Sequence, residues 1–124
     1  MSNDIRRLIE EIHSSDHKAV LTMAGAGTRS LMWLMTVPGA SNTILEALVP
    51  YSREAMKDFL GYQPVGYVSQ EQATHMASRA YALALRLREG GDTVVGVGCT
   101  AAISTKQPKA GGHRSHIVTW DEVG

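Results

Sequence analysis

Apolar residues along this chain recur with two different periods, and the two periods alternate. Residues 3–12 follow the i, i+3, i+4, i+7 spacing of an amphipathic helix, which Asn3 and Asp4 can cap. Lys18–Met23 is a short continuous apolar run, which is typical of a buried strand. A glycine turn at 24–28 opens a second predicted helix, and Pro38-Gly39 stops it.

The alternation continues through the rest of the chain. Thr43–Tyr51 predicts a strand, and Ser52 caps a helix that runs to Leu60 and ends at Gly61. The longest predicted helix runs from Ser69 to about Glu89, with Leu83 and Leu87 on its inner stripe. After it the sequence predicts a strand over Thr93–Cys99, a loop over 100–112 and a strand over Arg114–Trp120. Strands that alternate with helices favour an α/β fold. We therefore expect a three-layer α/β/α single domain over residues 1–124, around a mixed, largely parallel sheet.

Composition narrows the class of protein. The chain has 124 residues, which is enough for one domain, and a formal net charge of zero, which favours neither a nucleic-acid nor a membrane-surface partner. No apolar run approaches the roughly 20 residues of a membrane span, and the polar start has no apolar signal core. The single cysteine, Cys99, rules out an internal disulfide and agrees with a reducing, cytoplasmic location.

The first candidate site is the glycine turn between the first predicted strand and the second helix. Gly25 and Gly27 allow the backbone to approach a ligand, Thr28 begins the helix, and Arg29 adds a cation. Unpaired N–H groups at a helix N-terminus suit an anion such as phosphate. A plain strand-to-helix turn explains the same residues equally well.

The second candidate site pairs Ser41 with Tyr51, and the third is the loop near the C-terminus. A serine hydroxyl becomes a nucleophile only when a neighbouring base removes its proton, so Ser41 alone is more simply a turn residue. In the loop, Lys109, His113 and Arg114, with Thr100 at its start, can hold a phosphate through charge-assisted hydrogen bonds. A solvated basic loop is the equal alternative.

The histidine spacing does not favour a metal site. His113 and His116 are three apart on a predicted strand and therefore face opposite sides, and one cysteine cannot complete a thiolate site. We expect neither a metal nor a cofactor.

Three further segments stand out: V-P-G-A-S at 37–41, Y-S-R-E-A at 51–55 and G-Y-V-S-Q-E at 66–71. They resemble segments of the C-terminal domain of the competence/damage-inducible protein family CinA, the nicotinamide-nucleotide amidohydrolases. Ser41 and Tyr51 keep the family's spacing of ten residues, whereas Met56 stands where the family has a lysine. The family's E-S-C-T-G-G turn is replaced at 23–28. The segment P-K-x-G-G-H-R and the preceding G-V-G-x-T instead resemble a divergent subgroup fused to nucleotidyltransferase-like domains.

The resemblance implies hydrolysis of the carboxamide of nicotinamide mononucleotide, or of a related nucleotide, to the acid and ammonia. It implies Ser41 as nucleophile, Tyr51 as a proton-transfer partner, and the glycine turn and the His113-Arg114 loop as holders of phosphate or oxyanion. Met56 cannot accept a proton, and Lys57 points about 100° away on a helix. The alternative is a non-catalytic nucleotide-binding or assembly module, a pseudoenzyme.

The resemblance also bears on assembly. The family domain normally continues through one more strand and a C-terminal helix, which this sequence does not show. A missing layer leaves an open sheet edge and an uncovered face. We therefore expect a homo-oligomer, with a small-molecule nucleotide as the other partner.

Overall fold

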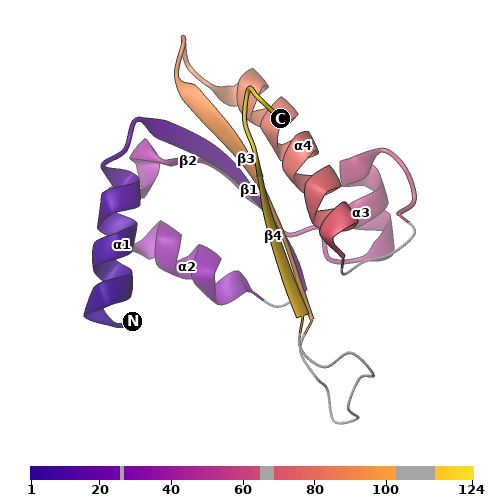
Figure 1. The fold of residues 1–124 in the computed structure, drawn as a ribbon, viewed down its shortest axis with the longest axis horizontal. Coiled ribbons are helices and arrows are strands. Elements are labelled where there is room, and N and C mark those ends of the chain that lie inside the picture. The colour runs from indigo at the N-terminus through magenta and orange to yellow at the C-terminus, as the bar shows by residue number, and fades with distance from the viewer. Residues whose placement is uncertain (26, 65–68, 103–113) are drawn as a thin grey trace.

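The computed structural model describes residues 1–25, 27–64, 69–102 and 114–124. In chain order the elements are α1 (Asn3–His13), β1 (His17–Gly25), α2 (Thr28–Thr36), the 3-10 turn η1 (Ala40–Asn42), β2 (Ile44–Leu48), α3 (Arg53–Leu60), α4 (Gln70–Leu87), β3 (Thr93–Ala102) and β4 (Arg114–Trp120). The strands form one sheet in the order β2-β1-β3-β4. β1 is parallel to β2 and β3, and β4 is antiparallel to β3. The predicted mixed, largely parallel α/β sheet is confirmed, with α1 and α2 on one side and α3 and α4 on the other (Figure 1).

Some predicted boundaries are wrong. The loop expected from residue 100 begins later, because Thr100, Ala101 and Ala102 continue β3 and pair with β4. The longest helix ends at Leu87, whose side chain is 37% exposed and does not join the inner stripe. No helix in the described ranges is both long and apolar enough to cross a membrane.

Helix α4 lies directly on the backbone of β3. A Cβ atom on Gly98 would stand 2.2 Å from the carbonyl oxygen of Ala73, and one on Gly96 would stand 2.2 Å from the amide nitrogen of Tyr81. Small residues on α4 complete this close approach: Ala73, Ala77, Ala80 and Ala84 are all fully buried. The sequence G-V-G therefore forms the surface on which the longest helix sits.

A second core cluster joins α3 to α4. Met56 and Leu60 of α3 pack with Met76 of α4, and Ala24 and Phe59 lie against them. Ser52 caps α3 by accepting a hydrogen bond from the amide of Ala55, and Gly61 ends it in a left-handed conformation, as the sequence predicted.

On the face of the sheet covered by α1 and α2, His13 forms hydrogen bonds that connect three elements. Its side chain is only 5% exposed. Its Nε2 donates to the carbonyl oxygen of Leu34 at 2.8 Å, and its Nδ1 forms a hydrogen bond with the hydroxyl of Thr43, also at 2.8 Å. The histidine thereby ties the end of α1 to α2 and to the start of β2.

His13→Ala is expected to lower the free energy of unfolding by roughly 2–3 kcal/mol, because it removes a buried side chain and both of its hydrogen bonds, to Leu34 and to Thr43. For a domain of this size we expect a fall in Tm of roughly 10 °C. His17→Ala, at an exposed position on β1, is the matched control and should change stability by less than about 0.5 kcal/mol. Equal thermal melts for the two variants would show that the His13 contacts contribute nothing.

The layer of α1 and α2 covers its face of the sheet thinly. No residue of α2 is buried, and Met32 and Met35 are 63% and 54% exposed. On the edge strand β4, Ile117 is 69% exposed. Self-association would cover apolar surface of this kind. The homo-oligomer stays a prediction.

Candidate functional site

Three helices begin at the same edge of the sheet. β1, β2 and β3 run parallel, so their carboxyl ends meet at one edge, and α2, α3 and α4 each start near it. In open α/β sheets, ligands bind outside the carboxyl ends of the strands. We call this region, from Gly25 and Gly27 across the ends of β2 and β3, the carboxyl edge.

The glycine turn at the carboxyl edge has the geometry that only glycine tolerates well. Gly25 has φ +80°, and a Cβ on it would stand 1.9 Å from the carbonyl oxygen of Ala101 on the paired strand. Gly27 has φ +117° and lies close to the Sγ of Cys99. Gly27 is the N-cap of α2. Because glycine has no side chain, it cannot accept a hydrogen bond from the backbone N–H groups of the first turn of α2.

The start of α2 differs in this respect from the starts of α3 and α4. Ser52 and Ser69 cap those helices by accepting hydrogen bonds from backbone amides, whereas α2 has no side-chain cap. Thr28 and Arg29 are both exposed on the first turn of α2. Uncapped N–H groups beside an exposed arginine can bind an anion.

The end of β3 is packed tightly beneath this edge. Thr100 is fully buried, and its hydroxyl points to the carbonyl oxygen of Ser69 at 3.5 Å. It thus faces the start of α4 instead of solvent. Burial raises the pKa of the neighbouring Cys99 thiol, so that thiol stays protonated and weakly nucleophilic at neutral pH.

The structure does not bring Ser41 and Tyr51 together. Ser41 lies in η1 before β2, and Tyr51 follows the other end of β2. A strand rises about 3.3 Å per residue, so the five residues of β2 alone separate the two side chains by roughly 15 Å within one chain. Both residues are exposed, Tyr51 at 82%. Tyr51 lies at the carboxyl edge and Ser41 at the opposite end.

Met56 occupies an apolar interior position. It is 1% exposed and packs with Leu60 and Met76. Lys57, the next residue on α3, is exposed. The position at which the resemblance places a lysine therefore faces a hydrophobic cluster in this chain.

Sequence reasoning missed a buried amide at the start of α4. Gln72 is 3% exposed, and its Nε2 has no hydrogen-bond partner among the residues that the structure describes. Gln72 lies four residues before Met76 and eight before Ala80, so the stripe of apolar residues that continues to it is the signal that could have revealed its burial. Buried amide donors are nearly always paired, so this one calls for a partner.

Sequence reasoning also missed a contact between a tyrosine and a histidine of α4. The hydroxyl of Tyr62 hydrogen-bonds Nδ1 of His75, and the two rings meet edge to face with centroids 5.5 Å apart. Burial, and after it the nearby Glu71 carboxylate, raises the pKa of Tyr62. Across the residues that the structure describes, no three His, Cys, Asp or Glu side chains are grouped to hold a metal ion.

The structure describes only part of the predicted phosphate-binding segment. Lys109 and His113 lie outside the described residues. Arg114 is the first residue of β4 and pairs with Ala102 at the end of β3. β3 therefore ends, and β4 begins, at the carboxyl edge.

Solved structures share this fold. The chain is similar to the competence/damage inducible protein CihA from Agrobacterium tumefaciens, with a TM-score of 0.67, 23% identity, and coverage of 100% of this chain and 78% of that one. It is also similar to a competence-damaged protein (CinA) superfamily protein from Enterobacter cloacae, with a TM-score of 0.57, 16% identity, and coverage of 97% and 77%. A CinA superfamily protein from Escherichia coli aligns with a TM-score of 0.51, 15% identity, and coverage of 100% and 81%. No family model and no curated protein matches the sequence. At this identity, the likeness shows that the chain has the CinA fold.

Proposed function

We propose that this chain is a divergent member of the nicotinamide-nucleotide amidohydrolases that binds a nucleotide at the carboxyl edge without hydrolysing it. The observation that carries the proposal is the burial of Met56 in an apolar cluster, where the family has its lysine. A serine hydroxyl needs a nearby base to become a nucleophile. The thioether of Met56 cannot serve as that base.

The placement of the other two residues agrees with loss of hydrolysis. Ser41 and Tyr51 are at opposite ends of β2, so a single chain offers no shared reaction centre for them. Lys57 is exposed and cannot replace the missing base at the position of Met56. The family's serine, tyrosine and lysine arrangement is thus not assembled within one chain.

Features of the carboxyl edge support binding of a phosphorylated ligand. The start of α2 has no side-chain cap, Arg29 is exposed beside it, and the glycines at 25 and 27 permit close approach. The unpaired Nε2 of Gln72 at the start of α4 adds a donor that a ligand oxygen can satisfy. His113, and Arg114 at the start of β4, are proposed to contribute further contacts to the phosphate.

Hydrolysis is tested by measuring ammonia release from nicotinamide mononucleotide, with a Ser41→Ala variant beside the parent protein. We expect no release above background from either protein, because Met56 cannot take the place of the family's lysine in activating a hydroxyl. Release by the parent that disappears in Ser41→Ala would contradict the proposal and establish an amidohydrolase that uses another base.

Binding is tested separately by calorimetric titration with nicotinamide mononucleotide. Arg29→Gln is expected to weaken binding roughly fivefold to tenfold through loss of a charge-assisted contact to phosphate. Arg7→Gln, at an exposed arginine of α1, makes the same change in charge and should bind like the parent. No detectable heat from folded parent protein would eliminate this nucleotide as the ligand.

A further inference from the structure

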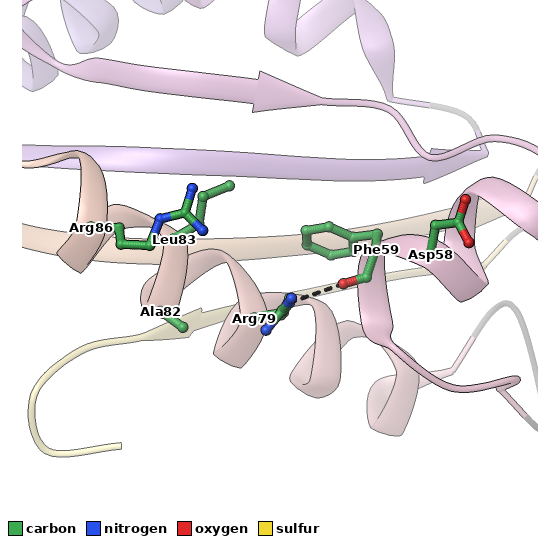
Figure 2. Close-up of a pocket in the computed structure, with 6 residues that line it drawn as sticks. All are labelled: Asp58, Phe59, Arg79, Ala82, Leu83 and Arg86. Carbon is green, nitrogen blue, oxygen red and sulfur yellow. Dashed lines mark hydrogen bonds between the residues drawn. The ribbon is translucent and has the colours of Figure 1, made fainter.

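A groove between α3 and α4 carries two arginines over an apolar floor. It encloses about 260 Å³ and is lined by Asp58, Phe59, Arg79, Ala82, Leu83 and Arg86 (Figure 2). Residues 79, 83 and 86 are spaced by four and three along α4, so they lie on one face of the helix. The small side chain of Ala82 leaves room beside them.

The two arginines have different surroundings. Arg79 donates from Nε to the carbonyl oxygen of Phe59 at 3.0 Å, which fixes its guanidinium at the last turn of α3. No described side chain forms an ion pair or a hydrogen bond with Arg86. Figure 2 shows Arg86 and Leu83 on one side of the groove and Phe59 on the other, with Asp58 beyond Phe59. Arg86 is therefore the cation that a bound group can reach.

We propose that this groove binds a small organic anion, namely a carboxylate or phosphate carried on a flat apolar body. The planar guanidinium of Arg86 suits the two oxygens of such a group, and the outer N–H groups of Arg79 can add to it. The ring of Phe59 and the side chain of Leu83 give the apolar body a surface to contact. With one carboxylate against two arginines, the lining keeps a net positive charge.

This site is separate from the carboxyl edge. α4 starts at the edge with Gln70, and a helix rises 1.5 Å per residue, so Arg79 lies roughly 14 Å and Arg86 roughly 24 Å along the axis. The inference therefore does not rest on nucleotide binding at the carboxyl edge. Arg29→Gln, which weakens binding there, should leave the groove unchanged.

The groove is tested by two-dimensional amide NMR of the full chain during titration with benzoate and, separately, with phenyl phosphate. We expect saturable shifts confined to residues 58–60 and 79–86. Arg86→Gln should weaken binding by roughly tenfold, the size of one lost charge-assisted interaction. Arg7→Gln is the matched control, and the spectrum itself shows whether each variant is folded.

The relative affinities of benzoate, phenyl phosphate, inorganic phosphate and benzyl alcohol show which chemical group the groove binds. Tighter binding of benzoate than of phenyl phosphate would assign a carboxylate site, and the reverse would assign a phosphate site. Inorganic phosphate should bind more weakly than phenyl phosphate if the apolar floor contributes. The proposal is overturned if neither aryl anion gives saturable shifts, if Arg86→Gln binds as tightly as the parent, or if neutral benzyl alcohol binds as well as benzoate.

Discussion

Gly98→Ala is expected to lower the free energy of unfolding by about 4 kcal/mol or more, although it adds a single methyl group. The added Cβ would stand 2.2 Å from the carbonyl oxygen of Ala73, 2.6 Å from the amide nitrogen of Ala77 and 2.9 Å from the Cβ of Met76. Two of these atoms belong to the backbone of α4, so no side chain can rotate away. The helix must move off β3, and overpacking of this kind is among the few mechanisms that give such large losses.

Chemical denaturation followed by circular dichroism measures this effect, since a loss of about 4 kcal/mol approaches the whole stability of a small domain. Gly91→Ala is the matched control, because nothing lies within 4 Å of a Cβ at that position. We expect the control to stay within about 0.5 kcal/mol of the parent. A Gly98→Ala variant as stable as the control would show that α4 does not contact β3 at Gly98.

The parts of the fold that the sequence predicted well are those set by local signals. The limits of α3 follow from Ser52 and Gly61, which cap the helix regardless of what packs against it. The strand at Arg114–Trp120 was also located correctly, between a glycine-rich segment and a polar end. The parallel sheet followed from the order of strands and helices, since parallel neighbours need a crossover between them.

Long-range contacts explain what the sequence could not predict. Gly96 and Gly98 belong to the motif G-V-G-x-T in the sequence. That they leave room for the backbone of α4 follows only from the way α4 packs on β3. His13 shows no recognisable metal-ligand spacing, and its partners Thr43 and Leu34 are 30 and 21 positions away. Such contacts become visible only when the elements are placed in space.

The candidate site illustrates a limit of motif spacing. Ser41 and Tyr51 keep the family's ten-residue spacing, and a strand was predicted between them. A strand of that length places residues before and after it at opposite ends of the sheet. The spacing therefore cannot by itself bring the two side chains into one site. Gln72 was missed for another reason, because a polar residue among alanines is not recognised as buried until the helix face is known.

Met56→Lys is expected to lower the free energy of unfolding by about 4 kcal/mol or more at neutral pH. Met56 is 1% exposed among Leu60 and Met76, so a lysine there must either bury its charge or lose its proton. Burial lowers the pKa of a lysine by up to roughly 3–5 units, and each unit corresponds to about 1.4 kcal/mol. Met56→Leu keeps the volume and the apolar character, and should cost less than about 1.5 kcal/mol.

The pH dependence of Met56→Lys separates a buried charge from simple misfit. With a lowered pKa in the folded state, the lysine binds more protons in the unfolded chain at any pH between the two pKa values. Stability therefore rises with pH, and the deficit relative to Met56→Leu should shrink between about pH 7 and pH 10. Chemical denaturation of both variants at pH 7 and at pH 10 measures this difference in the free energy of unfolding. A small, pH-independent loss would mean that the new ammonium group reaches solvent. In that case a pocket for the family's lysine already exists at position 56, and the proposal that hydrolysis was lost through burial of Met56 would fail.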